Sequence, residues 1–181
     1  MIHIEKTIKS EIVYEGKIFN IRRDYVHISE TKSSTRDIVV HNGAAAAVVI
    51  KDDGKLVMVK QYRKPMEAVI LEIPAGKLEK GETPEEAIRR EIEEETGYKA
   101  KKIELLTKMN PAAAYTTEII TIFIASELTK GKTNFDFDEG IEIVEMDIDD
   151  IYKMIMSGDI IDAKTIIGVL MARELQLKTK R

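Results

Sequence analysis

The stretch GKLEKGETPEEAIRREIEEETGY, residues 76–98, decides the fold of this chain. Within it, Thr83-Pro84-Glu85-Glu86 has threonine at an N-cap, proline at the first helical position and glutamate at the capping-box position. Gly97 ends the pattern, because glycine readily adopts the left-handed conformation that follows a last helical turn. The pattern therefore predicts a helix over residues 84–96.

Eight glutamates lie in this stretch, and their number alone is typical of a solvated helix face. Their positions indicate something more specific. At about 100° per residue, Glu91, Glu94 and Glu95 share one arc of the helix. Ile88 and Ile92 lie beside that arc and are expected to pack inward. Like charges so close to a core repel one another, so the arc predicts a positive partner such as a divalent cation.

The other side of the same helix carries both signs of charge. Glu86 and Arg90 are four residues apart, and so are Arg89 and Glu93. Pairs at this spacing commonly form exposed ion pairs. We therefore expect these four residues to pair in this way, away from the acidic arc.

Composition narrows the class of protein. With 181 residues, the chain suits one domain of ordinary size with at most a small appendage. Charged residues make up 33% and apolar residues 44%, as in soluble globular proteins. No apolar run approaches the roughly 18 residues of a membrane span, and the first residues lack the apolar core of a signal peptide, so we expect a cytoplasmic protein with no membrane partner. A net charge of -4 argues against a nucleic-acid partner and leaves room for a small phosphorylated ligand.

The reactive side chains are mainly carboxylates. The chain has no cysteine, which excludes disulfides, thiolate nucleophiles and zinc-thiolate sites. The histidines, His3, His27 and His41, are scattered and are expected to be structural, and the serines lack the context of a nucleophile. Carboxylate oxygens suit magnesium or manganese, and magnesium is often shared with substrate phosphates. The sequence thus indicates metal-dependent phosphate chemistry.

Hydrophobic patterns outside the helix predict a mixed α/β (α+β) order of elements. A small β region is expected over residues 12–14, 18–28 and 36–40. Asp53-Gly54 predicts a hairpin turn, because this pair favours the turns that join antiparallel strands. The two strands of this hairpin are expected at residues 44–50 and 56–61. Later strands are expected at residues 69–73, 102–107, 119–125 and 142–145. Two helices are expected after them, one at residues 149–157 and one from an Asp162 cap to about Leu175.

Residues 76–98 resemble the signature box of the Nudix hydrolase family. This resemblance implies the Nudix fold, a mixed β-sheet sandwiched between α-helices, with a small N-terminal antiparallel β region. Its intervals agree with the box as well as its residue types. The matching residues are Gly76, Glu82, Arg90, Glu91, Ile92, Glu94, Glu95, Gly97 and Tyr98.

The resemblance also implies roles for these residues. It implies two or more magnesium ions, with manganese as an alternative, and a water that they activate. Arg90 and Glu82 are expected to brace the loop and the helix, with Glu94 counted both as a catalytic residue and as a metal ligand. The metal ligands implied by the family are Glu91, Glu94, Glu95 and the main-chain carbonyl of Ala75.

Over roughly residues 11–177, the chain is most similar to bacterial ADP-ribose pyrophosphatases. This implies hydrolysis of ADP-ribose to AMP and ribose 5-phosphate. Two alternatives stay open: another nucleoside diphosphate derivative, such as a nucleotide sugar or FAD, and a non-catalytic regulator that binds ADP-ribose. The segments that carry the likeness are Gly16-Lys17-Ile18-Phe19, Arg36 to His41, Gln61-Tyr62-Arg63, Glu72-Ile73-Pro74-Ala75-Gly76 and Asp162-Ala163-Lys164-Thr165.

One departure from these enzymes lies after the box. They carry a serine-proline-glycine-aromatic stretch there, whereas this chain has Pro111 displaced, or Ala113 in place of the proline if Tyr115 and Glu118 are aligned. The selectivity that this loop signals is therefore open.

Substrate contacts follow from the chemistry of ADP-ribose. Adenine offers a flat face to an aromatic ring such as Phe19, and pyrophosphate suits the planar, charged guanidinium of Arg63. Arg36, Glu72 and Tyr115 are further candidates. The structural alternatives are a buried core phenylalanine, solvated arginines and an edge-strand glutamate.

The family resemblance supplies two further expectations. The general base is a glutamate on a loop after the box, for which we take Glu139, with Asp136 or Asp138 as alternatives and a solvated acidic loop as the structural one. The resemblance also implies a homodimer, in which residues 1–42 form a dimerisation element beside a catalytic domain over residues 43–181. Phe19 of one subunit would then reach the adenine site of the other.

Overall fold

A computed structural model describes residues 2–29, 31–135 and 140–179 of the chain. By its internal contacts the chain forms two compact units. The first unit comprises Met1–Gly43 and Asn110–Ile119, and the second comprises Ala44–Met109 and Ile120–Arg181. The loop after the signature box, residues 110–119, thus belongs with the N-terminal strands. The predicted division into residues 1–42 and 43–181 places this loop in the catalytic domain instead.

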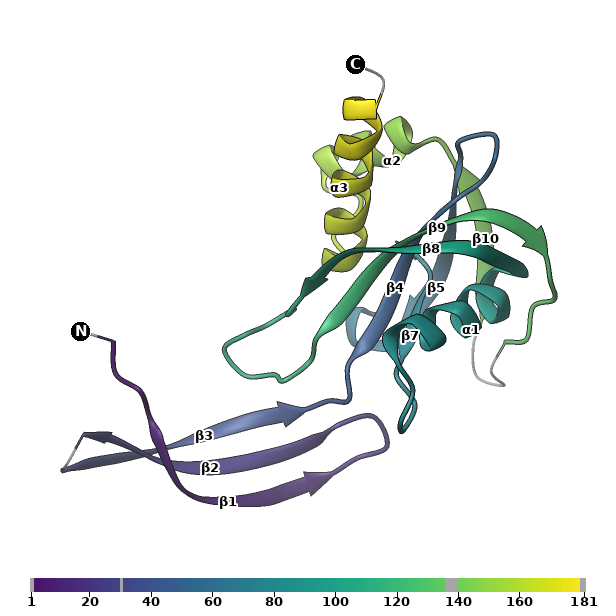
Figure 1. Ribbon diagram of the computed structural model, residues 1–181. Helices are drawn as coiled ribbons and strands as arrows, with labels where there is room; N and C mark the ends of the chain where they lie inside the picture. The colour runs from purple at the N-terminus through teal and green to yellow at the C-terminus, as the bar shows by residue number, and fades with distance from the viewer. Residues whose placement is uncertain (1, 30, 136–139, 180–181) are drawn as a thin grey trace. The chain divides into compact units, whose positions relative to one another are not determined.

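The first unit is an antiparallel sheet of three strands in the order β1-β2-β3 (Figure 1). It confirms the predicted β region with longer strands: β1 (Lys6–Glu15), β2 (Asn20–Ser29) and β3 (Lys32–Val40). The loop of residues 110–119 attaches to the end of β3 through main-chain hydrogen bonds, in which Val39 N–H donates to Tyr115 O at 2.7 Å and Thr117 N–H to Val39 O at 2.9 Å. Tyr115 is therefore part of this unit.

The second unit is built on a mixed sheet of seven strands (Figure 1). Its main path runs β10-β5-β4-β9-β8, with β6 paired to β5 and β7 paired to β4. The β4–β9 pair is parallel and the other pairs are antiparallel. The strands are β4 (Ala44–Ile50), β5 (Leu56–Arg63), β6 (Ala68–Glu72), β7 (Ala75–Lys77), β8 (Tyr98–Met109), β9 (Ile120–Lys130) and β10 (Ile141–Met146), with a 3-10 turn η1 (Lys64–Met66) after β5.

Helices cover both faces of this sheet, which confirms the predicted Nudix-type architecture. Side chains alternate along β4, as they must in a strand. Ala45, Ala47 and Val49 pack in one core cluster with Ile88 and Ile92 of α1 (Pro84–Thr96). The intervening side chains of β4 pack in a second cluster with residues of α2 (Ile148–Ser157) and α3 (Ala163–Thr179). Figure 1 shows α1 on one side of the sheet and the other two helices on the opposite side.

Helix α1 begins and ends as its sequence predicts. The Glu86 N–H donates to Thr83 Oγ1 at 3.3 Å, and the Thr83 N–H donates to Glu86 Oε2 at 2.9 Å, which completes the capping box. At the other end, Gly97 has a φ of 69°, in the left-handed region where glycine is favoured. The acidic residues of the helix are therefore held in a fixed register.

Strand β7 is absent from the sequence prediction. Its three residues contain a glycine and follow Pro74, so neither length nor composition signals a strand. Pairing with β4 creates it, since Ala45 lies opposite Gly76 and Ala46 opposite Ala75.

Among the described residues, no helix is long and apolar enough to cross a bilayer.

Candidate active site

The predicted acidic arc lies on α1 where the helix faces β7. Glu95 is only 3% exposed, and its Oε2 accepts a hydrogen bond from the Ala75 N–H at 3.1 Å. This bond fastens β7, which carries the candidate carbonyl ligand Ala75, to the helix that carries the carboxylates. Glu91 and Glu94 are half-buried on the same helix. The structure thus brings Ala75 next to the acidic arc, as the family resemblance implies.

Arg90 braces this region through several acceptors. Its Nε and Nη2 donate to the two carboxylate oxygens of Glu82 at 3.0 and 3.1 Å. Its Nη1 donates to Glu91 at 2.7 Å and to Glu94 at 3.0 Å, and its Nη2 reaches the Lys77 carbonyl at 3.3 Å. The hydrogen bonds that Arg90 donates to Glu82, ahead of the one that it donates to Glu91, hold the pKa of Arg90 above its usual value.

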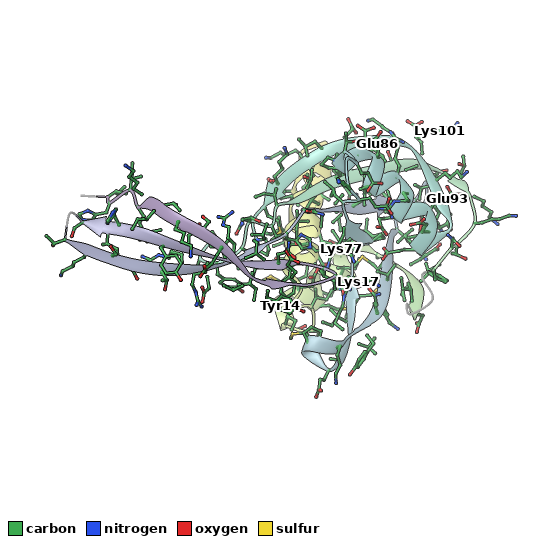
Figure 2. All side chains as sticks on the ribbon, turned by 90° about the horizontal axis from the view of Figure 1, so that it is seen from below. Tyr14, Lys17, Lys77, Glu86, Glu93 and Lys101 are labelled. Atoms are coloured by element: carbon green, nitrogen blue, oxygen red, sulfur yellow. The ribbon has the colours of Figure 1, made fainter. Side chains whose placement is uncertain are left out.

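The pairs that we expected on the other side of α1 are wrong. Arg90 turns to the acids and to the loop before the helix, whereas Glu86 is used in the capping box. Arg89 pairs with Glu85 at 2.8 Å and Glu93 with Lys99 at 3.2 Å. Figure 2 shows Glu86 and Glu93 at the outer surface of the unit. Helical spacing identifies only partners within α1, so the partner of Arg90 in the preceding loop, Glu82, follows from the family resemblance and not from the spacing.

Gly76 is the residue that lets β7 and α1 approach each other here. A methyl carbon at this position would lie 1.8 Å from Glu91 Oε1 and 1.9 Å from its Cδ. Such distances are far below van der Waals contact. The side chain of Glu91 therefore occupies the space that any larger residue at position 76 would need.

The residues around Glu95 fit a hard divalent cation in donor type. Glu91, Glu94, Glu95 and the Ala75 carbonyl supply only oxygen, the donor that magnesium prefers. Across the described residues, no three acidic, histidine or cysteine side chains converge into a ready-made metal cage. Arg90 holds one oxygen of Glu91 and one of Glu94.

Arg63 and Glu72 form the second charged feature of this unit. Arg63 ends β5, and its Nε and Nη2 donate to the two oxygens of Glu72 at 2.7 and 3.0 Å. Glu72 is 2% exposed and also contacts the ammonium group of Lys164. The side chain of Arg63 is 40% exposed, so its guanidinium pairs with a buried carboxylate while part of the side chain is in contact with solvent. The phosphate contact of Arg63 stays a prediction.

Two opposing effects set the pKa of Glu72. Burial raises the pKa of a carboxyl group, because it disfavours the charged form. The hydrogen bond from Arg63 and the charge of Lys164 outweigh burial and hold the pKa of Glu72 below its usual value. Glu72 is thus a buried anion with two cationic partners. Lys164 belongs to a segment that resembles the family, but the sequence does not predict its contact with Glu72.

The remaining substrate candidates lie in the first unit. Phe19 follows the β1–β2 turn, is 39% exposed and has its ring centroid 6.2 Å from that of Tyr14. The alternative of a buried core phenylalanine is therefore wrong, while the adenine contact stays a prediction. Tyr115 is 57% exposed. Arg36 on β3 is held by Glu5, with Nε at 3.0 Å from Oε2, and by the Thr35 carbonyl at 2.8 Å.

The candidate general base lies outside the described residues. Glu139 and its alternatives Asp136 and Asp138 all fall in residues 136–139. Their role stays a prediction from the family resemblance.

Comparison with known proteins supports the same identification of residues 76–98. A family model described as NUDIX domain matches residues 40–166. The chain is 44% identical over 176 residues to the ADP-ribose pyrophosphatase of Bacillus subtilis (strain 168), which covers 96% of this chain and 94% of that protein. It is 41% identical over 167 residues to the methanol dehydrogenase activator of Bacillus methanolicus, covering 91% and 90% of the two chains.

A solved structure shows the same fold. The crystal structure of an ADP compounds hydrolase superimposes with a TM-score of 0.86 and covers 97% of this chain and 95% of that chain. The two sequences are 22% identical, so this likeness concerns the fold alone.

Proposed function

Since the chain belongs to the NUDIX domain family, we propose that it hydrolyses the pyrophosphate bond of ADP-ribose to give AMP and ribose 5-phosphate. The observation that carries this proposal is the acidic arc beside Ala75. Glu95 is buried and fastened to the Ala75 N–H, and Glu91 and Glu94 lie on the same helix face. A chain that only folded around this helix would have no need of three carboxylates so close to its core.

The proposed chemistry is metal-assisted hydrolysis. Magnesium held by Glu91, Glu94, Glu95 and the Ala75 carbonyl would neutralise the pyrophosphate and lower the pKa of a bound water. Arg90 and Glu82 keep the loop and the helix together while the carboxylates act, since Arg90 contacts both. We assign the role of general base to Glu139 on the grounds of family resemblance. No covalent intermediate with the protein is required.

Each compact unit has its own candidate substrate contacts. In the second unit, Arg63 presents a guanidinium suited to the pyrophosphate, next to the buried Glu72. In the first unit, Phe19 and Tyr115 present exposed aromatic rings suited to adenine, and Arg36 presents a further cation. The similarity to an ADP-ribose pyrophosphatase over nearly the whole chain supports this substrate over other nucleoside diphosphate derivatives.

A substrate panel tests the choice of ADP-ribose. Purified protein with magnesium is offered ADP-ribose, a GDP-sugar, a UDP-sugar, FAD and ATP, and products are separated by chromatography. We expect ADP-ribose to have the highest kcat/KM, at least about tenfold above each competitor, because the chain resembles an ADP-ribose pyrophosphatase over nearly its whole length. A higher kcat/KM for a nucleotide sugar or FAD would transfer the proposal to that substrate, as the altered loop around Tyr115 would allow.

A second candidate function is regulation of a partner enzyme. The similarity to an activator of methanol dehydrogenase favours it, since that relative matches over 91% of this chain. Binding of ADP-ribose without any magnesium-dependent product release would support a purely non-catalytic role and would overturn the hydrolase proposal.

We further propose that residues 1–42 form the dimerisation element of a homodimer. Strands β1 and β2 and the turn between them carry exposed apolar side chains, and an isolated sheet of three strands needs a hydrophobic face to be stable on its own. The first unit has one buried apolar residue among those described, Val26. The exposed apolar side chains in β1, β2 and the turn between them are Ile8, Ile12, Val13, Tyr14, Ile18, Phe19 and Ile28.

Light scattering tests the dimer. We expect a mass twice the chain mass of 20.5 kDa, and we expect Ile12→Glu on β1 to shift the protein towards the monomer. Lys9→Glu on the same strand is the matched control, because Lys9 is an exposed polar residue whose contacts, with Glu11 and the ring of Tyr25, lie within the same sheet. A wild-type monomer that is fully active at nanomolar concentration would contradict both the dimer and the assignment of Phe19 to the other subunit's site.

A further inference from the structure

Lys164 lies at the centre of a charged cluster that joins β6 to the start of α3. Its side chain is 11% exposed, and its ammonium group contacts Glu72 and, at 3.0 Å, Asp162. Glu72 is separated from Lys164 by 92 residues in the sequence. The contact therefore exists only in the folded chain, between two segments on either side of the catalytic helix in sequence.

The position of Lys164 is fixed by the N-terminal turn of α3. Asp162 accepts hydrogen bonds from the Thr165 N–H at 2.9 Å and from its hydroxyl at 2.6 Å. The Thr165 oxygen in turn accepts the Ile73 N–H at 2.9 Å, one residue after Glu72. Thr165 is fully buried. The lysine is thus held at Glu72 by two anchored segments and is not a flexible surface cation.

Charge decides what this lysine does for Arg63. The cluster contains two cations, Arg63 and Lys164, and two carboxylates, Glu72 and Asp162, so it is formally neutral. Without Lys164, one negative charge would be in excess, and Arg63 alone would have to compensate the buried Glu72. A buried carboxylate without a partner is costly, so Arg63 would then be committed to Glu72 and less available to an anion.

We propose that Lys164 is a positioning residue for the substrate: it neutralises Glu72, so that the positive charge of Arg63 remains available to the pyrophosphate. This inference rests on the proposed function, because it assigns Arg63 to a pyrophosphate ligand. Arg63 presents the edge with Nε and Nη2 to Glu72, and the edge that includes Nη1 is the one suited to a phosphate oxygen. Lys164 itself touches no reacting atom in this account.

Replacement of the lysine separates this role from a purely structural one. We expect Lys164→Met to raise the KM for ADP-ribose about tenfold or more with kcat changed less than about threefold, since the lost term is attraction for the bound anion. Lys164→Arg, which keeps the charge, should stay within about threefold of wild type. Calorimetry without added divalent metal should show the same loss of ADP-ribose affinity in Lys164→Met.

Further variants complete the test. Lys164→Met combined with Glu72→Gln removes the carboxylate that needs the lysine, so its KM should lie within about threefold of that of Glu72→Gln alone. Lys51→Met is the matched control, because Lys51 also contacts two carboxylates, Asp53 at 3.4 Å and Glu145 at 2.6 Å, and neither belongs to the cluster. Its KM should remain that of wild type.

The outcomes distinguish failure of this inference from failure of the proposed function. If wild type hydrolyses ADP-ribose while Lys164→Met keeps its KM, or loses only kcat, the positioning role is overturned and the proposed function stands. If wild type neither hydrolyses nor binds ADP-ribose, both are overturned. Should Lys164→Met fail to fold, the double variant decides: a KM within about threefold of that of Glu72→Gln supports the role, and a KM tenfold above that of Glu72→Gln overturns it.

Discussion

Replacing Glu95 by glutamine is expected to lower kcat for ADP-ribose by about 10² to 10³, while the protein keeps its fold. The carboxylate charge is lost, and with it a ligand for the ion that neutralises the pyrophosphate. The hydrogen bond to the Ala75 N–H, 3.1 Å long in the structure, survives because the glutamine side chain also has a carbonyl oxygen. The measurement is steady-state kinetics with magnesium, accompanied by thermal unfolding of both proteins.

Glu93→Gln is the matched control for this variant. Glu93 lies on the same helix two residues earlier and pairs with Lys99 at 3.2 Å, away from the acidic arc. Its kcat should remain within about threefold of wild type, because a partly exposed ion pair of this kind contributes little. If Glu95→Gln loses only a factor of a few, or if Glu93→Gln loses as much as Glu95→Gln, the assignment of Glu95 to the metal site is wrong.

Gly76→Ala is expected to lower kcat by about 10² with a change of less than about 1 kcal/mol in the free energy of unfolding. The added methyl carbon would lie 1.8 Å from Glu91 Oε1, so the side chain of Glu91 must move. Because that side chain is flexible and partly exposed, it can move at small cost to the fold. The Glu91 carboxylate then leaves the position from which it is proposed to bind the metal. Kinetics and chemical denaturation measure the two effects separately.

Gly131→Ala provides the comparison for this second variant. A methyl carbon at position 131 would lie 2.9 Å from Glu93 Oε1, so it also displaces a glutamate of α1, but one outside the acidic arc. We expect full activity from it. Wild-type activity in Gly76→Ala would show that the position of Glu91 is immaterial to catalysis, and a large loss of stability would show that Gly76 serves packing instead.

The elements whose signals are local could be predicted from the sequence. The capping box at Thr83 and Glu86 and the glycine end of α1 depend only on residues within a turn of one another. The turn at Asp53-Gly54 likewise joins β4 to β5 as its residue types indicate. The acidic arc follows from helical geometry, and the structure places Ala75 beside it as the family resemblance implies.

What the sequence missed depends on pairing between distant segments. Strand β7 exists because β4 offers it a partner, since its own three residues have no strand signal. Helical periodicity paired Arg90 with Glu86, whereas Arg90 bonds to Glu82 in the preceding loop, as only the family resemblance implies. Lys164 meets Glu72 only when α3 packs beside β6. Long-range contacts of this kind are set by tertiary packing, so local sequence patterns do not predict them.

The most direct test of the central claim is the reaction of wild-type protein with ADP-ribose, followed by chromatography of the products with magnesium and with excess chelator. We expect AMP and ribose 5-phosphate in equal amounts with magnesium and no reaction with chelator. Activity should return when magnesium is added back. Intact ADP-ribose in the presence of magnesium, or the same products at the same rate in chelator, would contradict this claim.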